Sequence, residues 1–401
     1  MLRRLALPAL LALGVSAFSV AQETKTSTPP ALRLEKVLPG DVPGFELPSA
    51  AAELPAAAAA PSPLPAMKKE PIAEGPAPHV ALILPLGSPS LGGVADAVRQ
   101  GFFAAVEFEG KKALPVRVVS TPDEGEAMLE ACLKAQANGA LVVVAGLTRD
   151  GATRLAKSDC PRQPTLVLNQ PADLVDLPQK LFWISLSLEQ EARQAARLAV
   201  DDGWHQAIVI ASASPLAKRV LEAFEREFQA AAGEVRGRVA FNGNPDEAAQ
   251  VKDRIAGMRG EMVFLALDPR SAMLARPYIS AMLPVYATSM SIDPRAEATV
   301  NLDLEGVRFV DMPWFVQPDH PAVMVYPAPK SRLSIDQERL YALGIDAYRI
   351  ATLLLKPEAK RPALDGVTGR LMLEGGNTFT RTLVPAEMSA GLPKPLKAAK
   401  P

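Results

Sequence analysis

The fold is decided by the stretch VALIL at Val80–Leu84, which runs directly into the turn-rich loop PLGSPS at Pro85–Ser90. A continuous apolar run of this length is typical of a strand that is buried on both faces of a parallel sheet. A helix is expected next, because apolar residues between Val94 and Phe108 recur at helical spacing. Together the three pieces predict one strand–loop–helix unit of an α/β fold.

The same unit repeats along the chain up to residue 186 and then starts again. The first series is expected to continue with strands at Val116–Val119, Ala140–Val144, Thr165–Leu168 and Leu181–Ile184, and with helices at Glu124–Ala137 and Asp150–Lys157. The second series is expected to hold helices at Leu188–Asp201, Pro215–Ala232, Asp246–Met258 and Pro269–Tyr278, and strands at Ala207–Ile210, Val235–Phe241, Met262–Leu265, Val285–Ala287 and Gly306–Val310. Such alternation predicts parallel, doubly wound sheets.

A long amphipathic helix at Ser334–Leu355 follows the second series, and Val367–Leu373 with Thr378–Leu383 is expected to form a terminal hairpin. The sequence therefore predicts an α/β protein with two doubly wound parallel-sheet lobes. Lobe 1 is expected to hold residues 79–186 and 311–395, and lobe 2 residues 187–310. In such sheets a ligand lies outside the carboxyl ends of the strands.

The N-terminal residues 1–21 are predicted to be a cleaved secretory signal peptide. Arg3 and Arg4 precede an apolar run, and SVA at Ser19–Ala21 supplies a cleavage site of the small-x-small type. The alternative is an uncleaved membrane anchor, because the run is close to the shortest stretch that spans a bilayer. A membrane is a partner only in that case, and the mature protein is expected to be periplasmic.

Residues 22–78 differ in kind from the rest of the chain, since they are rich in proline and alanine and include the run Ala56–Ala60. Proline removes backbone donors and fixes φ, so neither a helix nor a sheet can propagate. This segment is predicted to be a disordered linker, either a spacer toward a partner or a tolerated tail. Residues 396–401 are expected to be a short C-terminal tail.

The composition excludes several classes of function. The 401 residues carry 43 basic and 44 acidic side chains, for a net charge of −1, which leaves no electrostatic footprint for nucleic acid. The three histidines (His79, His205 and His320) and two cysteines lie far apart, without the spacing of a zinc site. No metal and no cofactor is expected. Cys132 and Cys160 fall on or next to neighbouring helices, which leaves a disulfide and two buried thiols as open alternatives.

Catalytic motifs are not found in the sequence. The candidate phosphate loop, Gly146–Gly151, is followed by Ala152 and Thr153 instead of a lysine and a hydroxyl residue, and no G-x-S-x-G or S-x-x-K pattern occurs. The chain is therefore predicted not to be an enzyme. What remains are polar loops at expected strand ends, whose cleft candidates are Ser88, Thr148, Arg149, Asn169, Gln170, Ser212, Asp268 and Ser289. The alternative is that Thr148 and Asp268, like Ser214, are simply helix N-caps, which their residue type and position explain unaided.

Several segments carry a resemblance to a known family. They are HVALILPLG (His79–Gly87), AVRQGFFAA (Ala97–Ala105), DMPWF (Asp311–Phe315), RLYALGIDAYR (Arg339–Arg349), LDGVTGRL (Leu364–Leu371) and the tail from Arg381 to Pro395. Over residues 79–395 the chain resembles the LppC/LpoA family of penicillin-binding protein activators. The resemblance implies a type I periplasmic-binding fold and a non-enzymatic activator of a class A penicillin-binding protein, the bifunctional peptidoglycan synthase. Family members are typically outer-membrane lipoproteins with a helical-repeat N-terminal domain, whereas this chain has no lipobox cysteine and carries the Pro/Ala linker in that place.

Two functions follow from these observations. The first is a periplasmic regulator that docks on a class A synthase. The alternative is a periplasmic solute receptor that delivers an amino acid or an amide to an importer, with a small molecule bound between the lobes. A cleft filled by apolar side chains such as Met290 or Trp314 favours the regulator, and a polar cleft favours the receptor.

Overall fold

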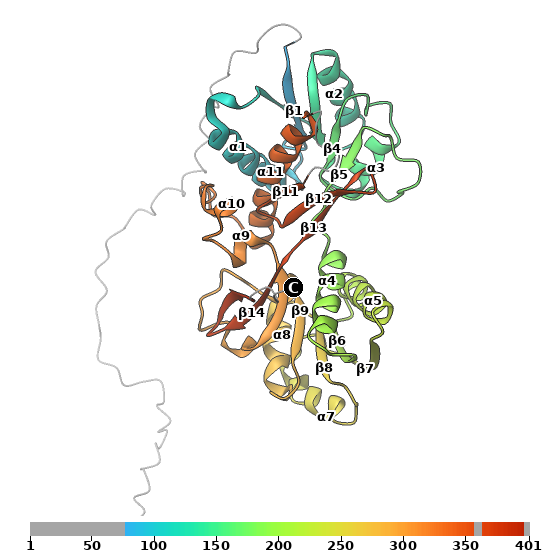
Figure 1. Cartoon of the computed structure of the whole chain (residues 1–401), viewed down its shortest axis with the longest axis vertical. Coiled ribbons are helices and arrows are strands. Elements are labelled where there is room, and N and C mark those ends of the chain that lie inside the picture. Colours follow the sequence, from blue (N-terminus) through green and yellow to red (C-terminus); the bar gives the residue numbers. More distant parts are fainter. Residues whose placement is uncertain (1–76, 357–362, 397–401) are drawn as a thin grey trace, which may run out of the picture. The chain divides into compact units, whose positions relative to one another are not determined.

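The computed structural model describes residues 77–356 and 363–396 of the chain. The predicted signal peptide, residues 22–76 of the predicted linker and residues 397–401 of the predicted tail lie outside the described residues. The described part forms two sheets with helices packed against them (Figure 1). This confirms the predicted α/β class with two sheets dominated by parallel strands.

The first sheet has eight strands in the order β11-β12-β13-β5-β4-β3-β1-β2. Its strands are β1 (His79–Leu84), β2 (Val116–Ser120), β3 (Ala140–Ala145), β4 (Thr165–Val167), β5 (Leu181–Trp183), β11 (Ala363–Asp365), β12 (Arg370–Glu374) and β13 (Thr378–Thr382). Strands β1 to β5 are parallel, with Leu82 of β1 opposite Val118 of β2 and Val144 of β3. The predicted hairpin is confirmed as the antiparallel pair β12–β13, which extends the sheet beyond β5.

Strand β1 is buried on both faces, as its apolar run predicts. Val80, Leu82 and Leu84 belong to the cluster that includes Phe102 of α1 (Gly92–Glu109) and residues of α11 (Ile335–Leu354). The alternate residues Ala81 and Ile83 belong to a second cluster, which includes residues of α2 (Glu126–Ala137) and α3 (Arg149–Ala156). Because side chains of a strand alternate between the two faces, these helices cover opposite sides of the sheet.

Helices α1 and α11 approach each other unusually closely. A Cβ atom built on Gly101 of α1 would lie 1.8 Å from the carbonyl oxygen of Tyr341, and one built on Gly344 of α11 would lie 2.1 Å from that of Val98. Only glycine fits at either position. The segments AVRQGFFAA and RLYALGIDAYR each contribute one of these glycines, so both segments have a packing role at this crossing.

The second sheet has seven strands in the order β15-β14-β10-β9-β8-β6-β7. Its strands are β6 (Gln206–Ala211), β7 (Glu234–Ala240), β8 (Met262–Ala266), β9 (Val285–Thr288), β10 (Val307–Asp311), β14 (Val384–Ser389) and β15 (Leu392–Pro395). Its main helices are α4 (Leu188–Asp201), α5 (Pro215–Ala230), α6 (Pro245–Ala248), α7 (Gln250–Ala256) and α8 (Pro269–Ala275). Strands β6 to β10 are parallel, and β14 and β15 are antiparallel additions at the edge.

The predicted boundaries of the two lobes are wrong at the C-terminus. Residues 384–395 are predicted to belong to lobe 1, but β14 pairs with β10 and β15 with β14, so both strands belong to the second sheet. The chain passes from β13 into β14 as it leaves one sheet for the other (Figure 1). The physical reason is the free edge of β10, whose backbone groups pair with those of β14, while the side chains of Ala386 and Met388 are fully buried on the face of the sheet.

Two predicted helices are shorter than expected. The segment predicted as one helix over Asp246–Met258 is divided into α6 and α7, and the segment predicted to end at Tyr278 leaves the α-helix at Ala275. A 3₁₀ turn follows at Arg276–Tyr278, where Pro277 lacks the N–H that a continued helix needs. Among the described residues, no helix combines the length and the hydropathy that crossing a membrane requires.

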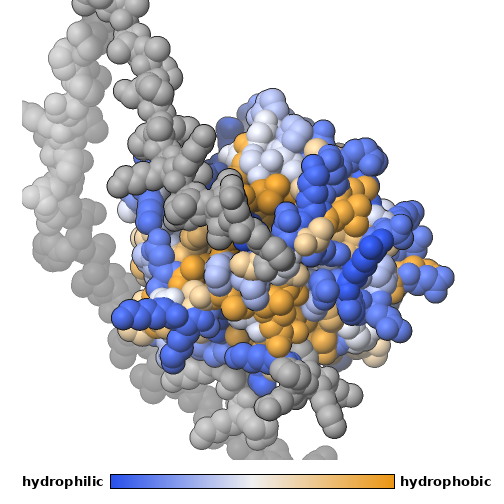
Figure 2. All heavy atoms as spheres, turned by 90° about the horizontal axis from the view of Figure 1, so that it is seen from above, coloured by the Kyte–Doolittle hydropathy of each residue, from blue (hydrophilic) through white to orange (hydrophobic). Residues whose placement is uncertain are grey.

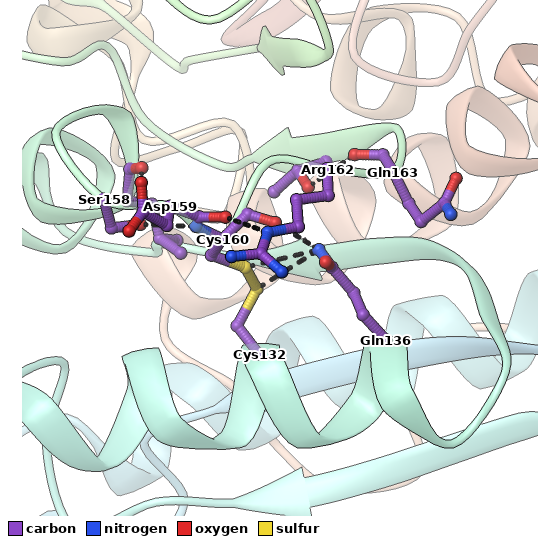
Figure 3. Close-up of a disulfide and its surroundings, with 9 residues drawn as sticks. Cys132, Gln136, Ser158, Asp159, Cys160, Arg162 and Gln163 are labelled. Atoms are coloured by element: carbon purple, nitrogen blue, oxygen red, sulfur yellow. Dashed lines mark hydrogen bonds between the residues drawn. A yellow bond between two sulfur atoms is a disulfide. The ribbon is translucent and has the colours of Figure 1, made fainter.

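The structure joins Cys132 of α2 to Cys160, in the segment after α3, by a disulfide bond (Figure 3). The Cα atoms are 6.1 Å apart, within the range that this bond allows. Both residues are buried, and Gln136, one turn after Cys132, donates its side-chain N–H to the carbonyl of Cys160. The bond and the hydrogen bond together attach α2 to the segment that follows α3.

Candidate functional site

In the first sheet, the predicted cleft residues lie at the carboxyl ends of β1, β3 and β4. Ser88 follows β1, and its hydroxyl accepts the N–H of Leu91 at the start of α1 (3.3 Å). Thr148 follows β3 and is the N-cap of α3, where its hydroxyl accepts the N–H of Gly151 (3.0 Å). The next residue, Arg149, is exposed. The N-cap interpretation of Thr148 is therefore confirmed.

Asn169 and Gln170 follow β4 in the same region. The side-chain amide of Asn169 donates to the carbonyl of Leu147 (3.0 Å), and its oxygen accepts the N–H of Gln170 (2.9 Å). Both residues are half-buried. The amide of Asn169 thus links the loop after β4 to the loop after β3.

In the second sheet, the candidates are spread over three loops. The hydroxyl of Ser212, after β6, lies 3.2 Å from that of Ser214. Asp268 is the exposed N-cap of α8, and its carboxylate accepts both the N–H (3.1 Å) and the hydroxyl (2.6 Å) of Ser271. Ser289, after β9, is buried and donates its N–H (3.2 Å) and its hydroxyl (2.6 Å) to the carboxylate of Glu191.

The pocket between β2 and α2 has a volume of about 330 Å³, and none of the eight cleft candidates lines it. It is lined by residues of the two elements and of their flanking loops, and by His79, the first residue of β1. Ligand contact at the eight candidates stays a prediction.

A buried ion pair joins the end of β10 to the first turns of α11. Both side-chain nitrogens at the tip of Arg339 donate to Asp311, at 2.6 and 2.9 Å, in a bidentate arrangement. The side chain of Asp311 is fully buried and also accepts the N–H of Met312 (2.7 Å). The guanidinium of Arg339 lies 4.7 Å from the ring centroid of Phe315, a cation–π distance. The geometry fixes the helix relative to this strand end.

A second buried arginine lies close to Glu191. Arg381 of β13 donates to the carbonyls of Ser185 (2.9 Å) and Thr368 (3.0 Å), and its remaining terminal nitrogen lies 3.9 Å from the carboxylate of Glu191. Burial, and then the nearby charge of Asp311, raise the pKa of Glu191, while the arginines act in the opposite direction. Burial lowers the pKa of Arg381. A buried charge is tolerated only with such partners.

Two further carboxylates of α11 hold the surrounding loops. Glu338 accepts the indole N–H of Trp314 (2.8 Å) and pairs with Arg295. Asp346, which is fully buried, accepts the N–H (2.8 Å) and the hydroxyl (2.7 Å) of Thr368, and burial raises its pKa. In the part of the chain that the structure describes, no group of three or more His, Cys, Asp or Glu residues is arranged to hold a metal ion. The buried carboxylates and arginines hold backbone segments in place, and most of their polar atoms already have partners in these hydrogen bonds and ion pairs.

Residues 49–391 match the family model described as "LppC putative lipoprotein". This chain belongs to the LppC family. The match covers every strand of the two sheets except β15, and every segment that carried the resemblance up to Gly391.

Several relatives of this LppC chain have names that state a role. This chain is 26% identical over 332 residues to "Penicillin-binding protein activator LpoA" of Photobacterium profundum. The alignment covers 74% of this chain and 53% of the relative. The chain is 26% identical over 381 residues to the LpoA of Pantoea ananatis, covering 81% of this chain and 55% of the relative. The chain thus spans about half the length of the curated relatives it matches.

Solved structures confirm the type I periplasmic-binding-like fold. Full-length LpoA from Haemophilus influenzae superposes with a TM-score of 0.65 at 22% identity, covering 79% of this chain and 58% of that one. A protein from Chromobacterium violaceum described as a "putative branched-chain amino acid ABC transporter" gives a TM-score of 0.68 at 37% identity, covering 77% of this chain and 99% of that one.

The buried network of this LppC chain is built by the segments that suggested the family. DMPWF supplies Asp311 and Trp314, RLYALGIDAYR supplies Arg339 and Asp346, and the C-terminal tail begins with Arg381. Of these residues the sequence pointed only to Trp314, as an apolar side chain that fills a cleft, and it did not single out Glu191. The burial of Arg381 could have been predicted from the sequence. Side chains of a strand alternate between its two faces, and Arg381 lies two residues after the buried Phe379 of β13.

In the part of the chain that the structure describes, the exposed large apolar side chains do not by themselves identify a partner site. Figure 2 shows hydrophobic and hydrophilic side chains mixed over one face of the molecule. Among the described residues, the most exposed large apolar side chains include Met282 (88%), Val175 (74%) and Met324 (66%), which come from three separate segments. Val175 and Met324 each lie next to another exposed apolar residue, Leu174 and Val325, and small groups of this kind are common on protein surfaces.

Proposed function

We propose that this chain is a periplasmic, non-enzymatic regulator that activates a class A penicillin-binding protein. The observation that carries the proposal is the family match over residues 49–391, together with relatives named as penicillin-binding protein activators. Export is inferred from the signal-like residues 1–21.

An activator acts only through a difference in affinity between the states of its target. A protein that bound the active and inactive synthase equally well would shift neither population. The buried ion pair of Asp311 and Arg339 fixes the end of β10 relative to α11, and a protein of fixed shape suits selection of one state. We expect this chain to bind the active conformation of the synthase more tightly and to raise its rate.

The test is a reconstituted synthesis assay. The purified chain is mixed with each class A synthase of the same organism, and glycan polymerisation and peptide cross-linking are measured. We expect a saturable rise in rate with one synthase, and no rise when the same chain is added after heat denaturation. Absence of both binding and rate change with every class A synthase would overturn the proposal.

The second candidate is a solute receptor for an amino-acid importer. It is favoured by one observation, the 37% identity to the Chromobacterium violaceum protein described as a "putative branched-chain amino acid ABC transporter". Calorimetric titration of the chain with leucine, isoleucine and valine discriminates between the two. Micromolar binding of one of them, combined with no effect on any synthase, would establish the receptor.

A further inference from the structure

Strand β2 forms one edge of the first sheet, and among the described residues no strand pairs with its outer side. On its inner side, the N–H of Thr121, directly after β2, donates to the carbonyl of Leu84 at the end of β1 (3.0 Å). Backbone groups of successive residues in a strand point to opposite sides. Val118, like Val116 and Ser120, therefore presents its N–H and its carbonyl on the outer edge.

The other three edges of the two described sheets carry features that prevent further pairing. Strand β11 has only three residues, and β15 contains Pro393 and Pro395. Strand β7 exposes Glu234, Arg236 and Arg238, and its register with β6 is interrupted. Short length, proline, charge and bulges are the usual protections of a sheet edge. Strand β2 has five residues, no proline and an unbroken register with β1, so it is the edge most open to an added strand.

The pocket between β2 and α2 lies beside this edge and is lined by an excess of positive charge. Its volume of about 330 Å³ is at the lower end of the range typical of ligand sites. On the side of α2, three alanines spaced one helical turn apart line it: Ala127, Ala131 and Ala135. Arg117 of β2 and Lys134 of α2 bring two positive charges to the lining, against one negative charge from Glu130. The pocket therefore favours an acidic group.

Lys134 is available to such a group at little cost. Its ammonium lies 2.6 Å from the carboxylate of Glu130, but both side chains are about two-thirds exposed (70% and 67%). An ion pair in that position contributes little to stability, because water screens it and both side chains lose freedom. A carboxylate entering the pocket can thus replace Glu130 as the partner of Lys134.

We propose that the outer edge of β2 binds an extended segment of a partner protein as an added strand, with an acidic side chain of that segment in the pocket. In such complexes main-chain hydrogen bonds supply affinity, and pockets for alternate side chains supply specificity. Arg117 and Val119 line the pocket, whereas Val116, Val118 and Ser120 offer the backbone groups. The inference goes beyond the proposed function, since it names a second contact surface and does not depend on a synthase.

The test titrates the full chain with an acetylated and amidated probe peptide, Thr-Val-Glu-Val-Thr, followed by NMR. We expect saturable binding that slows solvent exchange of the Val118 amide and leaves that of Val119, which faces β1, unchanged. A peptide with glutamine in place of glutamate should bind about tenfold more weakly, the low end for loss of a charged hydrogen-bond partner. The glutamate peptide with every backbone nitrogen methylated should not bind.

Surface variants of α2 test the role of charge in the pocket. Lys134→Ala should weaken binding of the glutamate peptide about tenfold and leave that of the glutamine peptide unchanged. Glu130→Ala should strengthen binding of the glutamate peptide, because it removes the competing carboxylate. The matched control is Lys218→Ala, which removes an exposed lysine of α5 and should bind both peptides as the wild type does.

Four results would overturn the proposal. The first three are absence of saturable binding of the glutamate peptide, equal binding of the glutamine or the methylated peptide, and unchanged binding by Lys134→Ala. The fourth is a wild-type dimer in analytical ultracentrifugation that Val118→Pro abolishes, because a second copy of the chain would then occupy the edge. Since no synthase is present, failure here is distinct from failure of the proposed function.

Discussion

Replacing Gly101 by alanine tests the closest backbone contact in the fold. The added Cβ would lie 1.8 Å from the carbonyl oxygen of Tyr341, whereas real Cβ contacts are essentially never under 3.0 Å. Helices α1 and α11 must therefore separate by about 1.2 Å, and a backbone carbonyl cannot rotate away as a flexible side chain can. Overpacking of this kind costs about 1–3 kcal/mol, and we expect the upper end of that range.

The intrinsic preference of the helix for alanine acts in the opposite direction and contributes about 1 kcal/mol. The expected net loss for Gly101→Ala is therefore about 2 kcal/mol of unfolding free energy. The matched control is Gly93→Ala in the same helix, where the nearest atom to the new Cβ is the side-chain nitrogen of Gln337 at 3.4 Å, an ordinary contact. That variant should gain up to ~1 kcal/mol.

Urea unfolding followed by circular dichroism measures both variants against the wild type. The m-values should stay unchanged, so that the shift in midpoint reports stability alone. A Gly101→Ala chain that is as stable as Gly93→Ala would refute the packing argument, because it would mean that the two helices separate without cost.

Three further variants test the buried network and the disulfide. Asp311→Ala leaves the buried charge of Arg339 without its partner and should cost about 3–5 kcal/mol in urea unfolding; a loss under ~1 kcal/mol would contradict the buried ion pair. Because burial holds the pKa of Glu191 above its ordinary 4.5, the folded state binds the extra proton, and stability should fall as the pH rises above 4.5. Relative to Glu191→Gln, the wild type should lose unfolding free energy toward neutral pH, and parallel pH profiles would contradict this. Removing the disulfide with Cys132→Ser and Cys160→Ser, which are 28 residues apart, should cost about 3–4 kcal/mol in the chain-entropy model. Alkylation of two free thiols in the oxidised wild-type protein would show that the bond does not form.

The sequence by itself determined the order and type of the main elements. The run Val80–Leu84 is apolar at every position because both faces of β1 are covered, and that property is visible locally. The helical spacing of apolar residues likewise predicts α1 and α11, since each helix buries one stripe. Glycines at the crossing of these two helices were visible in the quoted segments, but the need for them came from the partner helix.

Tertiary structure alone decided which segments meet. Periodicity reports that a strand is buried and says nothing about which sheet edge it joins, so β14 was placed in the wrong lobe. In the same way, the sequence does not show which backbone groups a loop carboxylate binds, because those groups come from other loops. Glu124, whose carboxylate accepts the N–H of Leu147, lies 23 residues before it, and Glu191 lies 98 residues from Ser289. The partners of these buried charges are set by the folded arrangement of strand ends, because a hydrogen bond depends on distance in space and not on separation along the chain.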